Sequence, residues 1–350
     1  MKRYVLIALC GVMLLAASMA TEVTAQIPSI EEMAQLHVAR ARAAAYEPGF
    51  YFTYIFDGLC RNPSPAQLAA SAQPTASPVN QPASRNTVPP REEWHLEPAK
   101  IFDNLYFLGS VNDSAWAVTT SEGIIIVDST VEFAVEGQIV EGLRTFGLDP
   151  ADIRYVVLSH AHGDRYFGAK HLQETYGARV ILSAADWVTV ADSNEPDELK
   201  PRKDMVATDG MKLTLGDTTL TLTLTPGHTP GTISTLIPLK DGNETHVGSI
   251  WGGNAFGYER YGLRYFPTEA DSIRTWRNSS RRYMEISKAA GADTYLSIHP
   301  HHDLTPAKIN ALRFRMPGDP HPFVNADAVQ NHLTVSTECM EAQLTWRESQ

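Results

Sequence analysis

Two histidines separated by one residue follow an apolar run, in the segment Ser159-His160-Ala161-His162-Gly163-Asp164-Arg165. Directly after a strand, this spacing can turn both imidazoles to one side, with the Asp164 carboxylate at a neighbouring point. Zinc binds imidazole nitrogen and carboxylate oxygen at about 2.0–2.2 Å, and a catalytic zinc keeps one position open. Water at that position has its pKa lowered to about 7 and becomes a nucleophile at neutral pH. The segment therefore predicts a hydrolytic zinc site.

Two later loops each present a histidine after a predicted strand. His228 lies between two Pro/Gly breaks, in Thr225-Pro226-Gly227-His228-Thr229-Pro230-Gly231, and His299 begins the run His299-Pro300-His301-His302-Asp303. Taken alone, His228 is equally well a turn residue, and His299 belongs equally well to a solvated polar cluster. Because all three segments follow strands, we expect them to converge on one sheet edge.

In order, these segments resemble the motifs of the metallo-β-lactamase superfamily. The resemblance covers roughly residues 94–350 and includes the preceding run Gly123-Ile124-Ile125-Ile126-Val127-Asp128. It implies an α/β fold, the four-layer αββα sandwich. It also implies two metal sites and one supporting carboxylate. The implied ligands are His160, His162 and His228 for a first zinc and Asp164 and His299 for a second, with Asp128 buried beside them as a non-ligand.

The second of these metal sites departs from the family pattern. Arg165 stands where relatives often carry histidine, and Ser249 stands where one lactamase subclass supplies a cysteine ligand. A guanidinium is always charged and cannot bind a metal. We therefore expect one tightly bound zinc and a weak second one, with His301 or His302 as the alternative third ligand. Arg165 is expected to pair with Asp164 or with a substrate carboxylate.

The resemblance also suggests residues for catalysis and substrate binding. Asp164 is expected to orient the nucleophile and to help move its proton to the leaving group. Arg165, Ser249 and Trp116 are the predicted substrate-binding residues, and plain packing explains the tryptophan equally well. Further candidates of this kind are Ser114, Trp251, and Tyr258 or Tyr261.

Serine at position 249 and the His299-Pro300 ending resemble the third subclass of zinc β-lactamases. The first expectation is therefore an exported zinc-dependent hydrolase that opens a lactam amide. An acyl-homoserine lactonase, or another ester or thioester hydrolase on the same fold, is the first alternative, because ring opening of a lactone needs the same attack. A zinc-binding homologue without catalytic activity, such as a receptor or scaffold, is the second.

The net charge limits the class of partner, and the N-terminal sequence predicts the location. The net charge of -11 argues against a nucleic-acid partner, which needs clustered Lys and Arg, and favours a small-molecule substrate. Lys2-Arg3 precedes an apolar run over 4–17 that is followed by small residues, so residues 1–25 are predicted to be a secretory signal peptide. The mature protein is then secreted or periplasmic, without a stable membrane anchor. Its oligomeric state is not readable from the sequence.

Residues 26–93 read as an N-terminal extension, and 94–350 as the catalytic domain that must position the site. The extension carries a predicted helix over 30–45, an aromatic patch over 50–56 and a proline-rich linker over 61–91. Cys60 and Cys339 either pair in an oxidising compartment or remain two buried thiols. Predicted strands cover 105–108, 116–119, 123–128, 154–158, 179–182, 211–215, 218–225, 232–238, 246–250 and 294–298. Predicted helices cover 131–146, 167–176, 186–190 and 269–290, followed by two closing helices.

Overall fold

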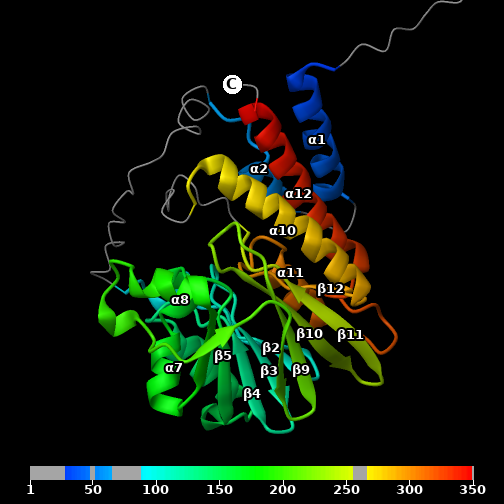
Figure 1. The fold of residues 1–350 in the computed structure, drawn as a ribbon. Coiled ribbons are helices and arrows are strands. Elements are labelled where there is room, and N and C mark those ends of the chain that lie inside the picture. Colours follow the sequence, from blue (N-terminus) through cyan, green and yellow to red (C-terminus); the bar gives the residue numbers. More distant parts are fainter. Residues whose placement is uncertain (1–27, 48–51, 65–87, 255–265, 349–350) are drawn as a thin grey trace, which may run out of the picture.

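Two β-sheets face each other at the centre of the fold, and helices cover the outer face of each (Figure 1). The computed structural model describes residues 28–47, 52–64, 88–254 and 266–348. The predicted signal peptide, most of the proline-rich linker, and Tyr258 and Tyr261 lie outside these residues. Among the described helices, none combines the length and apolar character needed to cross a bilayer.

The first sheet has seven strands in the order β1-β2-β3-β4-β5-β6-β7. They are β1 (Ala99–Phe102), β2 (Leu105–Phe107), β3 (Trp116–Thr120), β4 (Gly123–Val127), β5 (Ile153–Val157), β6 (Arg179–Ser183) and β7 (Met205–Ala207). Strands β4 to β7 run parallel. Their carboxyl ends therefore meet at one edge, which is where ligands bind in parallel sheets.

The second sheet has five strands in the order β12-β11-β10-β9-β8. They are β8 (Met211–Leu215), β9 (Thr218–Leu224), β10 (Ile233–Asp241), β11 (Glu244–Ile250) and β12 (Thr294–Tyr295). β8 to β11 form an antiparallel meander, and β12 joins β11 in parallel. The Thr/Leu alternation of β9 places its leucines on one face, as the period of a strand requires.

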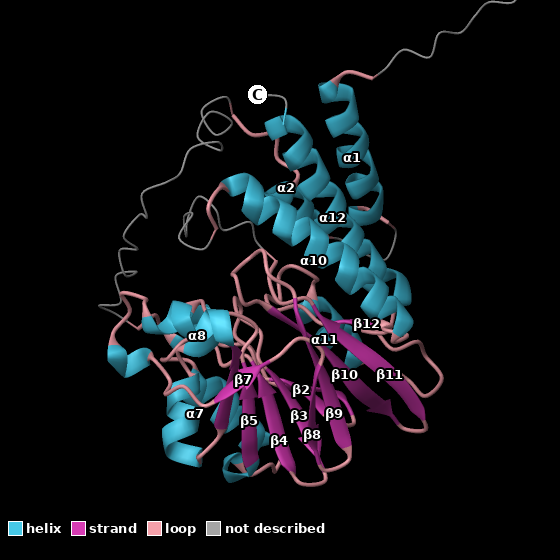
Figure 2. Cartoon of the chain, in the orientation of Figure 1, coloured by secondary structure: helices cyan, strands magenta, loops and turns pink. Residues whose placement is uncertain are grey.

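Alternating side chains of the strands build three apolar layers. Along β4, Ile124 and Ile126 face a cluster with the helices, whereas Ile125 and Val127 face the second sheet. Helices α5 (Glu141–Thr145), α7 (Ala169–Tyr176) and α8 (Ala184–Ala191) cover the first sheet, and Figure 2 shows α7 and α8 on that side. Helices α10 (Glu269–Ala289) and α12 (Ala326–Glu348) cover the second sheet. The fold is thus the expected αββα sandwich.

Some predicted elements differ in length from those observed. The helix expected over 131–146 is a π-helical turn over Glu136–Val140 followed by α5, because Ser129 and Thr130 hydrogen-bond to the backbone of Arg165 and Gly168. The strand expected over 294–298 ends at Tyr295. After that point Ile298 accepts a hydrogen bond from the Ser114 N–H, outside the sheet. The short strands β1 and β7 were not predicted.

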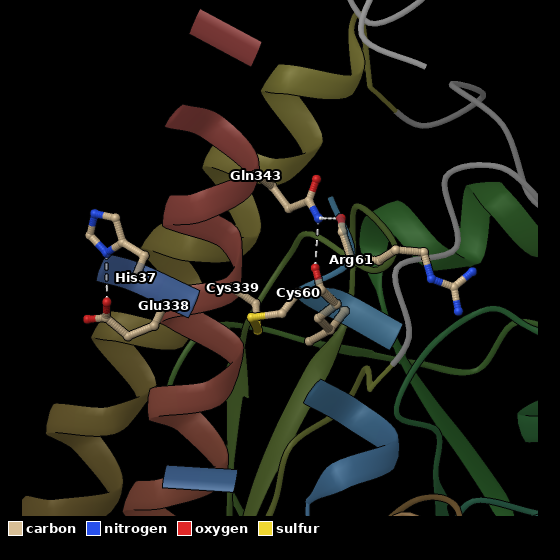
Figure 3. Close-up of a disulfide and its surroundings, with 7 residues drawn as sticks. His37, Cys60, Arg61, Glu338, Cys339 and Gln343 are labelled. Carbon is tan, nitrogen blue, oxygen red and sulfur yellow. Dashed lines mark hydrogen bonds and ion pairs between the residues drawn. A yellow bond between two sulfur atoms is a disulfide. The ribbon is translucent and has the colours of Figure 1, made fainter. Parts of the chain in front are cut away.

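The N-terminal extension packs on the C-terminal helix rather than standing apart. Helix α1 (Ile30–Ala45) has its predicted bounds, and its buried alanines share a core with α2 (Thr53–Leu59), α10 and α12. Cys60 forms a disulfide with Cys339 in α12, which decides between the two expectations for these cysteines (Figure 3). Beside it, the Gln343 amide donates hydrogen bonds to the carbonyls of Leu59 at 2.8 Å and Arg61 at 2.7 Å.

Candidate metal centre

The two histidines of the first motif lie on the loop that leaves β5. Asp128, at the end of the neighbouring β4, holds the start of this loop: its carboxylate accepts the Ser159 N–H at 2.7 Å and the Ser159 hydroxyl at 2.9 Å. Asp128 has a positive φ of 62°, a conformation that costs energy and recurs at functional sites. It is 1% exposed. As expected, Asp128 supports the ligand loop and lies outside the histidine cluster.

Three imidazole nitrogens converge at this edge. His228 Nε2 lies 3.2 Å from His160 Nε2 and 3.0 Å from His162 Nδ1. The opposite nitrogen of His160 lies 2.7 Å from the Gly252 carbonyl, which fixes the proton on Nδ1 and leaves Nε2 as a lone pair. Tetrahedral zinc ligands are about 3.3 Å apart. The spacing therefore fits one metal ion.

The electrostatics of the three histidines agree with a metal site. Burial, and then the neighbouring His228, lower the pKa of both His160 and His162 well below the usual range. The two rings are therefore neutral at physiological pH, the form that binds a metal. Neutral rings with lone pairs turned toward one another repel, and a cation among them removes that repulsion. Three imidazole nitrogens are a donor set that fits a metal ion such as zinc.

Asp186 joins the two ligand loops, and sequence reasoning missed it. Its fully buried carboxylate accepts the Ala161 N–H at 3.0 Å, the Thr229 hydroxyl at 2.6 Å and the Gly231 N–H at 2.9 Å. Burial raises its pKa to about 6. One carboxylate at the start of α8 thereby fixes His160 and His162 relative to the loop of His228.

A second cluster lies beside the first. One ligand atom each from Asp113, Asp164 and His299 lies within 4.8 Å of the others. His299 Nδ1 is 2.8 Å from the Asn112 carbonyl, so that nitrogen carries the proton and Nε2 is the free one. His299 Nε2 lies 3.7 Å from Asp164 Oδ2, a separation that a shared metal can bridge. Asp113 was not predicted, although it precedes the candidate Ser114 directly.

Arg165 occupies the interior of this second cluster. Its Nη2 lies 2.7 Å from Asp113 Oδ1 and 2.8 Å from Asp164 Oδ2, and its Nη1 donates to the Ile298 carbonyl at 2.6 Å. Although burial opposes it, the Asp164 and Asp113 carboxylates raise the pKa of Arg165, so the guanidinium stays charged. The expected pairing with Asp164 is therefore present. Asp113 is the additional partner.

Comparison with known proteins shows which proteins the chain is similar to. The family model of the metallo-β-lactamase superfamily matches residues 109–242. A subclass B3 metallo-β-lactamase of Bradyrhizobium japonicum is 25% identical, with a TM-score of 0.59 over 73% of this chain and 96% of that one. A metallo-β-lactamase of Cronobacter sakazakii is 28% identical, with a TM-score of 0.61 over 73% and 96%. Residues 109–242 thus match the metallo-β-lactamase superfamily, and the fold over 73% of the chain is similar to that of these enzymes.

Two curated enzymes match the chain over a shorter stretch. An N-acyl homoserine lactonase of Agrobacterium fabrum is 34% identical over 112 residues, 29% of this chain and 42% of that protein. A hydroxyacylglutathione hydrolase of Acidiphilium cryptum is 33% identical over 123 residues, 35% of this chain and 43% of that protein. The chain thus spans less than half the length of these curated relatives.

Within the superfamily fold, the three predicted substrate-binding residues are not accessible, which corrects that expectation. Arg165 is 0% exposed, and Trp116 and Ser249 are each 1% exposed. The Trp116 indole donates to the Ser297 carbonyl at 3.1 Å, and the Ser249 hydroxyl donates to Tyr283 at 3.2 Å. The polar groups of Trp116 and Ser249 are thus already paired within the protein. Ser114 and Trp251 are buried as well.

His301 and His302, which follow His299, do not complete a metal site. The His302 ring stacks on Tyr54 at a centroid distance of 4.6 Å, and His301 meets the same ring edge-on at 4.8 Å. The expectation that one of them is a third ligand finds no support in this geometry.

Gly253 shows how closely the first site is packed, because a Cβ there would lie 2.3 Å from the Cβ of His228.

Proposed function

We propose that the protein is an exported zinc hydrolase that opens the amide bond of a β-lactam ring. The observation that carries the hydrolase part is the convergence of three imidazole nitrogens, with His228 Nε2 3.2 Å from His160 Nε2 and 3.0 Å from His162 Nδ1. The lactam part is supported by the similarity to metallo-β-lactamases over nearly their whole length. We further propose a small-molecule substrate and no nucleic-acid partner, in keeping with the charge of -11.

Zinc in the three-histidine site would supply Lewis acidity for the carbonyl and a nucleophile at neutral pH. Asp164 lies next to that site with its side chain 29% exposed, so it can contact both nucleophile and substrate. Although burial opposes it, Arg165 holds the pKa of Asp164 well below the usual range. Asp164 is thus a carboxylate throughout the physiological range. It accepts a hydrogen bond from the attacking group and passes the proton toward the leaving nitrogen.

We propose that one zinc binds tightly and that a second binds weakly. A second ion has Asp164 Oδ2 and His299 Nε2, 3.7 Å apart, as its candidate ligands. It competes there with Arg165 Nη2, which hydrogen-bonds to both Asp113 Oδ1 and Asp164 Oδ2. The carboxylates of Asp113, Asp128 and Asp164 with the Arg165 guanidinium sum to a formal charge of -2, which one zinc neutralises. Metal analysis after dialysis should give one equivalent per chain. Two tightly held equivalents would contradict the proposal.

Hydrolysis of a chromogenic cephalosporin tests the activity. We expect turnover that a chelator abolishes and zinc restores, and that His228→Ala removes together with the metal. As a control, His171→Ala changes a half-buried histidine on α7 that lies outside the cluster and should leave turnover unchanged. Turnover that survives both the chelator and His228→Ala would refute a metal-dependent mechanism.

Lactone hydrolysis is the second candidate activity, favoured by the 34% identity to an N-acyl homoserine lactonase. Turnover of acyl-homoserine lactones without turnover of any lactam would select it. A protein that binds one zinc and hydrolyses neither lactams, lactones nor thioesters would instead be a non-catalytic homologue. These three outcomes are exclusive and use the same preparation.

Export to the periplasm or the outside of the cell is proposed on two features. One is the sequence of residues 1–25, with its basic pair and apolar run. The other is the Cys60–Cys339 disulfide, because such bonds form and persist in oxidising compartments. Fractionation of a host cell, followed by N-terminal sequencing of the exported protein, tests the proposal. A protein that stays in the cytoplasm with its first residues intact would overturn it.

A further inference from the structure

An exposed aromatic residue of the N-terminal extension lies against the loop of the second metal cluster. Tyr54, in α2, is 58% exposed. Its ring stacks on His302 with an interplanar angle of 26° and meets His301 edge-on at 83°. These two histidines follow His299 in the chain. A segment more than two hundred residues away in sequence thereby reaches the metal loop.

The contact continues inward to a predicted metal ligand. The rings of His301 and His302 lie 5.7 Å and 4.9 Å from that of His299, centroid to centroid. Only one side chain therefore separates Tyr54 from His299. His302 is 3% exposed, so its ring lies on the buried side of Tyr54, while much of the tyrosine surface stays open to solvent.

Helix α2 is fixed on both sides of Tyr54. Before it, the buried Phe52 packs edge-on against Tyr295 and His332, each at a centroid distance of 5.3 Å. After it, Cys60 is covalently bound to α12. An exposed aromatic ring held in place at both ends loses little conformational entropy when a ligand packs on it. The fixed position of the Tyr54 ring is therefore suited to ligand recognition.

We infer that Tyr54 forms the rim of the substrate site and selects substrates whose reacting group carries an apolar, preferably aromatic, side chain. The inference rests on the proposed function, since the reacting group is placed at the metal centre. An aromatic pair contributes about 0.5–1.5 kcal/mol, which corresponds to a preference of about 2- to 10-fold. Tyr54 acts on specificity in this scheme and takes no part in the chemical step.

Binding of two carboxylate probes tests the rim without any catalysis. Butyrate and 4-phenylbutyrate share a metal-binding group and differ by a phenyl ring, and both can be titrated into cobalt-loaded protein by visible absorption. We expect 4-phenylbutyrate to bind more tightly, and Tyr54→Ala to lower the ratio of the two affinities by about 2- to 10-fold. Tyr54→Phe should keep the ratio, because it keeps the ring.

Tyr46→Ala is the matched control. Tyr46 is a tyrosine of the same extension, 49% exposed, and it contacts Phe56 instead of the metal loop. It should leave the ratio unchanged. An unchanged ratio in Tyr54→Ala would overturn the inference, as would an equal loss in Tyr46→Ala. Thermal unfolding of each variant verifies that the fold is retained.

Kinetics separate this inference from the proposed function. With a cephalosporin that carries an aromatic side chain, Tyr54→Ala should raise KM by about 2- to 10-fold and leave kcat unchanged. With a small polar side chain, neither constant should change. If the wild-type protein hydrolyses no lactam, the proposed function fails while the probe ratio still decides the role of Tyr54. If lactams are hydrolysed but the ratio does not respond to Tyr54→Ala, the rim inference alone fails.

Discussion

His332 should make the protein less stable in acid, and replacing it with phenylalanine should remove that effect. The ring is 1% exposed, and among the described residues neither of its nitrogens has a hydrogen-bond partner. It stacks on Tyr295 at 4.3 Å and meets Phe52 edge-on. Burial lowers the pKa of His332 from 6.5 to about 3. His332→Phe keeps a flat ring at this position and removes the titration.

The sign and size of the effect follow from proton binding in the two states. Above pH 6.5, His332 is neutral whether the chain is folded or unfolded, and it contributes no pH dependence. Between pH 6.5 and about 3 the unfolded chain binds a proton that the folded one excludes, so stability falls as the pH falls. pH 5 lies about 1.5 units below the unfolded-state pKa of 6.5, which corresponds to a loss of about 2 kcal/mol in the free energy of unfolding.

Urea unfolding of the metal-free protein, with its disulfide intact, measures this loss. The free energies of unfolding of wild type and His332→Phe are compared at pH 8 and pH 5. Other groups also titrate in this interval, but they contribute to both proteins and cancel in the difference. We expect the variant to gain about 2 kcal/mol relative to wild type on going from pH 8 to pH 5. A difference between the two proteins that is the same at both pH values would refute the reasoning.

Three further changes test other parts of the structure. Asp186→Asn should weaken zinc binding by about 10- to 100-fold in a chelator competition, because one of the two acceptor oxygens that join the loops of the first site becomes an NH2 group facing other donors. Asp152→Asn, an exposed control, should not weaken it. Arg165→His replaces the internal cation with a possible ligand and should raise the tightly bound metal above one equivalent per chain. A variant that still holds only one equivalent after dialysis would contradict this. Replacing Cys60 and Cys339 with serine should lower stability by about 2–5 kcal/mol in urea, with the metal content unchanged; an equal stability would show that the bond adds nothing.

The sequence predicted those parts of the site that are local in the chain. Each ligand motif follows a strand directly: His160 and His162 follow β5 of the first sheet, and His228 follows β9 of the second. Because loops that leave strand ends can meet at one edge, the sequence places His160, His162 and His228 together. The alternation of apolar residues likewise predicted most strands and the layered fold, because burial of one face imposes that period.

What could not be predicted depends on contacts between distant segments. Asp113 reaches Arg165 across 52 residues, and Asp186 reaches Gly231 across 45. Neither lies in a motif, and nothing near them in sequence reveals the partner. For the same reason the sequence left two possible partners for the Arg165 guanidinium, Asp164 or a substrate carboxylate. Its burial and its hydrogen bond to Asp164 identify Asp164 as the partner. Tyr54 belonged to an aromatic patch whose packing partner only the fold supplies.

The disulfide also imposes an order on biosynthesis. Cys60 and Cys339 are 279 residues apart, and α12 is the last helix of the described chain. The extension therefore emerges from the ribosome long before its covalent partner exists, and Cys60 must remain a free thiol until the whole catalytic domain has been made. The third cysteine, Cys10, would leave with the proposed signal peptide, so no wrong partner remains within the chain. Closure of this bond thus requires that synthesis has passed Cys339 in α12.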